Sequence, residues 1–229
     1  MPWRQVLRRV EDRWWYGKPR AHFLHVSKTG GTAVRHALEP YRTAGRYHVV
    51  FHPHEVSLAD VPAGEKFFFF LRDPASRFGS AFYSRQRQGR PRYHNPWSPE
   101  EAAAFARFAT PDALARAIGT PEGDAAMRGI LLLRDPFWSW LVDRATFESR
   151  CGDLLFAGFQ ETLNADFAQL RELLGLPATV ALPEDDVHAH RNPAGLDKRL
   201  SPEAMERLRE WYREDYEWLA RIQEWNRAG

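Results

Sequence analysis

The stretch FLHVSKTGGTAVRHAL at residues 23–38 decides the fold class. It joins a short apolar run, predicted to be a strand over 21–26, to a turn with two adjacent glycines. Apolar residues then recur at helical spacing, which predicts a helix over 32–39 that ends at Pro40. A strand that passes through a tight turn into a helix is the repeating unit of parallel α/β proteins.

The same alternation continues along the chain. Further strands are predicted at 47–51, 66–71 and 153–159, and the second of these, KFFFFL, is apolar on both faces like a central parallel strand. Helices are predicted from Asp73-Pro74 onward, near 99–108 and 111–118, over 160–174, and from Ser201-Pro202 to about residue 226. We therefore predict a three-layer α/β fold with a mainly parallel sheet flanked by helices.

The length of the chain fits one domain over residues 1–229. The net charge of +2 gives no strong field that would draw the chain to nucleic acid. Cys151 is the single cysteine, so no intramolecular disulfide is possible. No apolar stretch approaches the ~20 residues of a spanning helix, and the first residues lack the apolar core of a secretory signal. We therefore expect a cytoplasmic protein.

Residues 2–16, PWRQVLRRVEDRWWY, predict an amphipathic helix within 1–18. Its apolar residues recur at helical spacing, with arginines between them. This pattern is typical of a helix docked on the domain, and also of a basic helix that rests on a membrane surface. Docked helices are far commoner, so docking is our first interpretation and peripheral membrane contact is the alternative.

The turn after the first strand has the features of an anion-binding loop. Gly30 and Gly31 let the main chain approach an oxyanion, and the N–H groups that begin the following helix lack intrahelical acceptors. Lys28 adds a full positive charge, and Thr29 and Thr32 add hydroxyl donors. The competing interpretation is a plain strand-to-helix turn with an incidental lysine.

A second anion-binding segment follows the third strand. Arg72 stands where a parallel strand meets the ligand crevice, and a guanidinium can grip a phosphate with two hydrogen bonds. Ser80 lies about two helical turns into the next helix, on the same face as Arg77. The alternative is structural, because Arg72 and Arg77 would also serve as surface charges or as partners of Asp73.

Together the two segments resemble the sulfotransferases that use 3′-phosphoadenosine 5′-phosphosulfate (PAPS), family 2. The likeness is greatest to Golgi carbohydrate sulfotransferases such as the heparan sulfate 2-O type. It rests on SKTGGTA at 27–33 and on RDPASR at 72–77 with Ser80, and it extends over 21–90 and 152–220. Ser27 replaces the usual proline, and Ala33 replaces a common serine whose hydroxyl is thereby lost.

The resemblance implies a P-loop-like fold, PAPS as donor, adenosine 3′,5′-bisphosphate (PAP) as product, and no required metal. It also implies roles for individual residues. The 5′-phosphosulfate would be held by Lys28, Thr29, Gly30, Gly31, Thr32 and Ala33. The 3′-phosphate would be held by Arg72 and Ser80. The catalytic groups would be His54 as base, Lys28 as the stabiliser of the bridging oxygen, and His52 beside the base.

An imidazole suits this base role, because the acceptor hydroxyl has to lose its proton near neutral pH. Two solvent-exposed loop histidines are the alternative. A metal site is a further alternative, because His52 and His54 form one His-x-His pair and His188 and His190 form another. The two pairs lie far apart in the sequence, so we predict no metal.

The acceptor is expected on the helical insertion at 91–151, for which the resemblance offers no motif. Its aromatic residues provide flat faces for a sugar or a lipid, although core packing is the competing interpretation for each. The candidates are Tyr93, Trp97, Phe137 and Trp138. The loop at 188–199 places Arg191 and Lys198 where they would close over the donor.

We therefore predict a PAPS-dependent sulfotransferase, of bacterial type, with an in-line transfer to a hydroxylated acceptor. The acceptor would be a carbohydrate, a glycolipid or a small metabolite, and the oligomeric state stays open. One rival is a P-loop nucleotide kinase, which requires a Gly-Lys-Ser or Gly-Lys-Thr loop that this sequence lacks. The other is a non-catalytic module that binds PAP.

Overall fold

A computed structural model describes residues 17–91, 93–183 and 195–228. Within these residues the sheet has four strands, all parallel, in the order β2-β1-β3-β4. The strands are β1 (Arg20–Leu24), β2 (His48–Phe51), β3 (Lys66–Leu71) and β4 (Leu154–Phe159). The predicted α/β class with a parallel sheet is confirmed.

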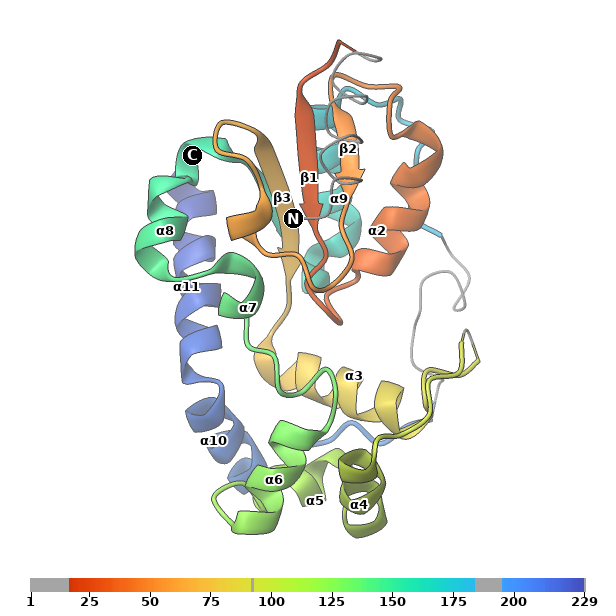
Figure 1. Cartoon of the computed structure of the whole chain (residues 1–229), viewed down its shortest axis with the longest axis vertical. Helices are drawn as coiled ribbons and strands as arrows, with labels where there is room; N and C mark the ends of the chain where they lie inside the picture. Colours follow the sequence, from red (N-terminus) through yellow and green to blue (C-terminus); the bar gives the residue numbers. More distant parts are fainter. Residues whose placement is uncertain (1–16, 92, 184–194, 229) are drawn as a thin grey trace.

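Helices cover both faces of the sheet (Figure 1). One face packs against α2 (Gly31–Leu38) and α9 (Leu163–Leu174). The other packs against α7 (Trp138–Leu141), α8 (Arg144–Ser149) and α11 (Arg213–Ala228). The phenylalanines of β3 are fully buried and alternate between the two faces, as the KFFFFL run predicted for a central strand.

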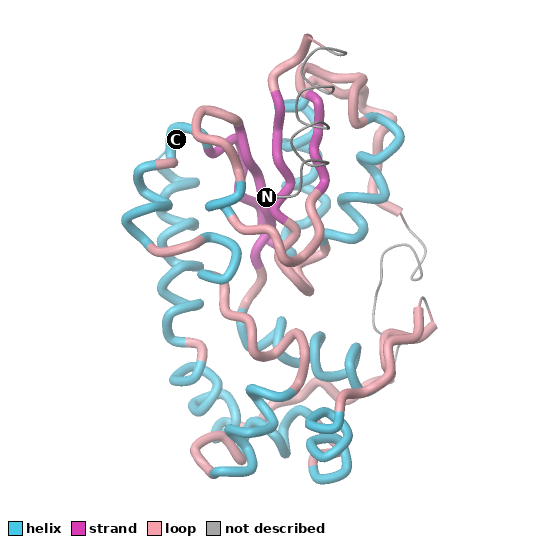
Figure 2. The backbone as a smooth tube through the Cα atoms, viewed as in Figure 1, coloured by secondary structure: helices cyan, strands magenta, loops and turns pink. Residues whose placement is uncertain are grey.

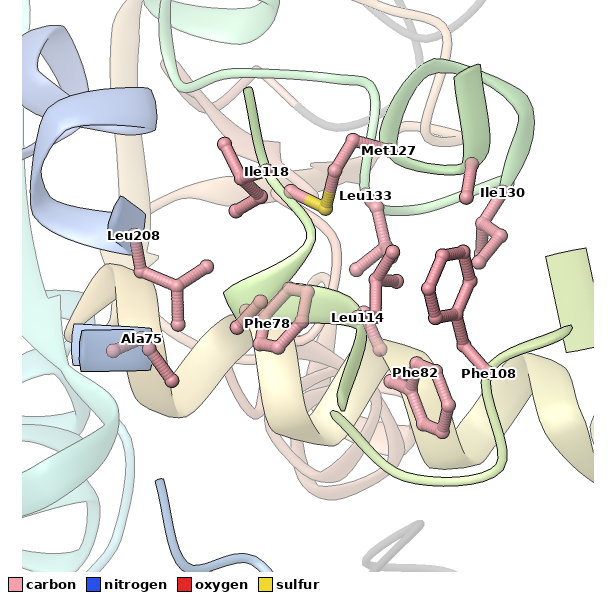
Figure 3. Close-up of a cluster of buried hydrophobic side chains, with 14 of the residues drawn as sticks. Ala75, Phe78, Phe82, Phe108, Leu114, Ile118, Met127, Ile130, Leu133 and Leu208 are labelled. Atoms are coloured by element: carbon pink, nitrogen blue, oxygen red, sulfur yellow. The ribbon is translucent and has the colours of Figure 1, made fainter. Parts of the chain in front are cut away.

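A group of helices with its own core lies beyond the carboxyl ends of the strands, and loops fill the region between (Figures 1 and 2). The group comprises α3 (Pro74–Gln86), α4 (Pro99–Arg107), α5 (Pro111–Arg116), α6 (Pro121–Gly129) and α10 (Pro202–Trp211). Its core is mainly apolar, with Phe78, Leu114 and Leu208 among the buried residues (Figure 3). Each of these helices has proline in its first turn behind a capping Ser, Thr or Asp side chain.

Short 3₁₀ turns complete the structure at η1 (Glu39–Tyr41), η2 (Leu58–Asp60), η3 (Cys151–Asp153) and η4 (Gln160–Thr162). Among the described residues, no helix combines the length and apolar character that a membrane span needs. Residues 2–16, for which we predicted an amphipathic helix, lie outside the described part of the chain.

Two expectations about helices are corrected. The predicted final helix is divided into α10 and α11 at Tyr212, whose φ of −101° and ψ of 26° leave the helical region. The Tyr212 hydroxyl donates to the carbonyl of Leu133 at 3.1 Å, so a tertiary contact holds the break. The helices α6, α7 and α8 were also not predicted, since α7 and α8 span only four and six residues.

Candidate active site

A cavity of about 820 Å³ lies at the carboxyl ends of the strands. Its walls come from the loop between β1 and α2, the turn after β2, the start of α3, and the segment that joins β4 to α9. Ligands of parallel α/β proteins bind at this edge of the sheet. The predicted residues Lys28, His54, Arg72 and Ser80 all line this one cavity, although they come from distant parts of the sequence.

The loop between β1 and α2 has the geometry of an anion cradle. Gly30 precedes α2 with a left-handed φ of 86°, and it carries no side chain that could cap the helix. The N–H groups of Gly31 and Thr32, the first two of α2, therefore have no side-chain cap. Lys28 also has a left-handed φ, of 65°, which costs a residue with a side chain about 1–3 kcal/mol. Such strain is typical of functional loops.

Two residues of the predicted anion loop have donor groups that already bind protein acceptors. The Thr29 hydroxyl is buried and donates to the carbonyl of Val26 at 3.0 Å, so it points away from the cavity. The main-chain N–H of Ala33 donates to the carbonyl of Gly30 at 3.0 Å. Thr32 and Ala33 do line the cavity, together with Gly30 and Gly31.

Gly31 packs directly against the buried His25 ring. A Cβ atom at this position would lie 2.4 Å from Cδ2 of His25 and 2.6 Å from its Nε2. We expect Gly31→Ala to lower the free energy of unfolding by about 1–3 kcal/mol, because the His25 ring would have to shift from its contacts with the rings of Phe23 and His54. Thermal unfolding would measure this loss.

The matched control for Gly31→Ala is Gly79→Ala in α3, where an added Cβ meets no atom within 4 Å. Alanine favours a helix by about 1 kcal/mol over glycine, so this variant should unfold at or above the wild-type temperature. A Gly31→Ala protein as stable as the Gly79→Ala protein would contradict the packing argument.

The ammonium of Lys28 lies in a strongly positive part of the cavity. Burial, together with the cations of Arg72 and Arg87, lowers the pKa of Lys28 to about 7. Near neutral pH this lysine is therefore divided between its charged and neutral forms. An anion bound beside it would favour the charged form.

Arg72 is held in place from both sides. Its Nη1 donates to the carbonyl of Lys28 at 3.4 Å, and its Nε donates to Oγ of Ser76 at 2.9 Å. Asp73 caps α3 by accepting from the N–H of Ser76, which turns the chain from β3 into the helix. Ser80, two turns into α3, faces the same cavity.

His54 is oriented as a proton acceptor. Its Nδ1 lies 2.7 Å from the carbonyl oxygen of His25, and a carbonyl oxygen only accepts, so the ring proton is on Nδ1. The Nε2 atom then keeps its lone pair, on a ring that is exposed and lines the cavity. The carbonyl of His54 accepts from Nε1 of the Trp140 indole at 2.7 Å, and this hydrogen bond holds the turn that carries His54.

His52 is placed differently from the prediction that puts it beside the base. Its Nε2 lies 2.8 Å from Nδ1 of His22, whose Nε2 lies 2.6 Å from a carboxylate oxygen of Glu65. The rings of His22 and His52 stack with centroids 5.1 Å apart. His52 does not line the cavity, so it supports the turn that carries His54.

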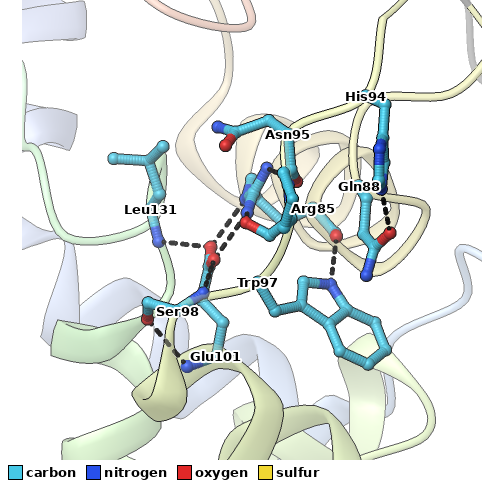
Figure 4. Close-up of polar contacts among 9 residues, drawn as sticks. Arg85, Gln88, His94, Asn95, Trp97, Ser98, Glu101 and Leu131 are labelled. Atoms are coloured by element: carbon cyan, nitrogen blue, oxygen red, sulfur yellow. Dashed lines mark hydrogen bonds and ion pairs between the residues drawn. The ribbon is translucent and has the colours of Figure 1, made fainter.

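Of the four aromatic residues predicted for the acceptor, Tyr93 alone lines the cavity. Trp97 lies against α3, where its Nε1 donates to the carbonyl of Arg85 at 2.7 Å (Figure 4). Phe137 is 0% exposed and belongs to the core beneath the sheet, so it cannot touch an acceptor in this structure. Trp138 is 50% exposed but faces two other surface hollows.

Lys198 lines the cavity, whereas Arg191 lies outside the described residues. The histidine pair at 188 and 190 also lies outside them. The wall of the cavity formed by residues 160–165, which includes Glu161 and Leu163, was not predicted from the sequence. Its position directly after a parallel strand was the signal that could have found it.

Comparison with known proteins adds to this geometry. No curated protein matches the chain. Residues 21–220 do match the model of the sulfotransferase family, and this range includes every described residue that we place in the cavity. The chain therefore belongs to the sulfotransferase family.

Proposed function

We propose that the chain transfers the sulfuryl group of PAPS to a hydroxyl of a carbohydrate or glycolipid-like acceptor. The observation that carries this proposal is the convergence of three chemically distinct groups on one cavity: the loop with Lys28, the pair Arg72 and Ser80, and the imidazole of His54. Membership of the sulfotransferase family supports sulfuryl transfer in general. The donor, the acceptor and the residue roles are parts of the proposal.

Two anion sites match the two phosphates of this donor. The loop before α2 would hold the 5′-phosphosulfate with the N–H groups of Gly31 and Thr32. Arg72 and Ser80 would hold the 3′-phosphate, which ATP and ADP lack. The wall at 160–165 would then lie along the nucleoside, with Leu163 packed over the loop close to Gly30.

The transfer step needs one base and one electrophilic stabiliser. The acceptor oxygen would attack sulfur in line with the bond from sulfur to the bridging oxygen, and this bond would break. The acceptor proton would pass to Nε2 of His54, the atom that its hydrogen bond to His25 leaves with a lone pair. Lys28 would stabilise the charge that develops on the bridging oxygen of the departing PAP. The products are a sulfate ester and PAP.

The rival kinase function needs a carboxylate that holds Mg²⁺. Asp73, the acidic residue of the second anion segment, uses one carboxylate oxygen to cap α3 and the other to accept from the Tyr216 hydroxyl at 3.2 Å. These contacts favour a structural role for Asp73.

The 3′-phosphate site is tested by Ser80→Ala. A hydrogen bond to a charged group contributes about 1.5–3 kcal/mol, so we expect PAP to bind roughly 10–100-fold more weakly while AMP binding stays unchanged. Titration calorimetry with both nucleotides measures this. Ser84→Ala is the control, because Ser84 is buried one turn further along α3 and does not line the cavity. Equal weakening of PAP and AMP would contradict the assignment.

Lys28 should couple donor binding to proton uptake. Its pKa in the free protein is about 7, and the phosphates of a bound nucleotide would raise that pKa. At pH 8 PAP binding should therefore take up close to one proton, and at pH 7 about half of one. The dissociation constant should rise with pH above 7, by up to about tenfold per unit.

Calorimetry in buffers of different ionisation enthalpy measures the proton uptake directly. The Lys28→Met variant serves as its control and should show no uptake at either pH. The same uptake in wild type and variant would assign the proton to another group.

A further inference from the structure

Arg77 follows Arg72 in the second anion segment, yet the structure turns its side chain away from the cavity. The guanidinium is 2% exposed. Its Nε donates to the carbonyl of Ser27 at 3.1 Å, and its Nη2 donates to Oγ of Ser27 at 3.2 Å and to the carbonyl of Asp135 at 2.6 Å. Ser27 immediately precedes Lys28, so Arg77 holds the first residue of the anion loop by hydrogen bonds.

The guanidinium of Arg77 also lies close to two aromatic rings. Its central carbon lies 5.3 Å from the centroid of Phe137 and 5.4 Å from that of Trp140. Trp140 in turn donates to the carbonyl of His54. One buried side chain therefore contacts both the loop that carries Lys28 and the indole that holds the turn of His54.

The charge of Arg77 is balanced by Asp215 at the start of α11. The two groups lie 3.5 Å apart, and Asp215 is 1% exposed. The other oxygen of Asp215 accepts from the N–H of Phe137 at 2.8 Å, which ties the 135–140 segment to the same centre. Burial raises the pKa of Asp215 to about 6, so this carboxylate is mainly ionised at pH 7.5.

We propose that Arg77 is a positioning residue that fixes the distance and angle between Lys28 and His54 by holding Ser27 and Trp140 at once. Nothing in the anion-binding role of the segment requires this, because Arg77 does not line the cavity. A guanidinium is suited to the task, since its planar fork reaches several acceptors while its face packs on an indole. The inference rests on the proposed function for its effect on turnover.

Two variants, compared at pH 7.5, test separately the contact of Arg77 with Ser27 and the contact of Trp140 with His54. Arg77→Lys keeps the charge beside Asp215 but loses the fork that holds Ser27. It should lower kcat by up to about 10²-fold, because both reacting groups shift, and it should also weaken PAP binding several-fold. Trp140→Phe keeps a ring but loses the N–H to His54, so it should lower kcat about tenfold while the Kd for PAP stays within about twofold of wild type.

The matched control is Glu101→Gln. Glu101 pairs with Arg85, a second buried arginine on α3, at 2.5 Å and at equal burial, but this pair contacts neither the anion loop nor the His54 turn (Figure 4). The control should lose stability without faster hydrogen exchange of the amides at 27–32 or 52–56. Its kcat is not compared, because Glu101 also accepts from the N–H of Leu131, which lines the cavity. The number of PAP sites per chain, from calorimetry, gives the folded fraction for each protein.

Hydrogen exchange provides a readout that does not depend on the reaction. In Arg77→Lys the amides of 27–32 and of 52–56 should exchange faster together, in Trp140→Phe those of 52–56 alone, and in Glu101→Gln neither set. Unchanged exchange of both segments in Arg77→Lys overturns the proposal, as does an equal effect in Glu101→Gln.

If Arg77→Lys does not fold, Trp140→Phe decides, and unchanged exchange at 52–56 with wild-type kcat overturns the proposal. A wild-type protein that does not bind PAP would instead overturn the proposed function, and the exchange comparison would still test Arg77.

Discussion

Replacing His54 by Asn should lower kcat by about 10²–10⁴-fold while PAP binds as tightly as in the wild type. The asparagine amide can take the place of Nδ1 and keep the hydrogen bond to the carbonyl of His25, so the turn stays in position. Only the lone pair of Nε2, which would accept the acceptor proton, is removed. Steady-state kinetics and calorimetry on the same protein measure the two quantities.

A second histidine variant separates the base role from support of the turn. His52→Gln is the comparison, because its amide can still contact Nδ1 of His22. It should lose far less activity than His54→Asn. Equal losses of kcat in the two variants would remove His54 from the base role.

Replacing Lys28 by Met should lower kcat by about 10²–10³-fold, whereas at pH 8, where Lys28 of the free protein is mostly neutral, the loss of PAP affinity should stay near tenfold. The lysine would act on charge that appears only as the bond to sulfur breaks, and PAP is the product in which the loop amides and Arg72 already hold the phosphates. Single-turnover kinetics with labelled PAPS separates the chemical step from product release.

The control for Lys28→Met is Lys66→Met, whose ammonium donates to the carbonyl of Gly152 outside the cavity. We expect its kcat to remain close to that of the wild type. Equal losses of kcat and PAP affinity in Lys28→Met would show that the lysine binds the ground state and the transition state alike.

The elements nearest the cavity were predicted well because their signals are local. The apolar run before Lys28, the paired glycines and the helical spacing after them are contiguous in the sequence, and β1 and α2 lie within two residues of the predicted bounds. The break at Tyr212 has no such signal, because the helical pattern continues through it and a contact with Leu133 makes it.

In the candidate site, too, features with a local sequence signal were predicted, and features that depend on tertiary contacts were not. Lys28, Arg72 and Ser80 could be placed from their positions at strand ends and helix starts. The orientation of His54 depends on the carbonyl of His25 in the loop after β1, and the burial of Arg77 depends on Asp215 in the last helix. An aromatic side chain suits a core as well as a binding surface, so its residue type could not separate Phe137 from Tyr93.

The proposed function requires that the cavity recognise a 3′-phosphorylated adenosine donor. Titration calorimetry with PAP and with ADP, each with and without Mg²⁺, tests it most directly. We expect tight binding of PAP at one site per chain, independent of the metal, and much weaker binding of ADP. Preferential binding of ADP in the presence of Mg²⁺ would contradict the roles of Arg72 and Ser80 and favour a nucleotide kinase.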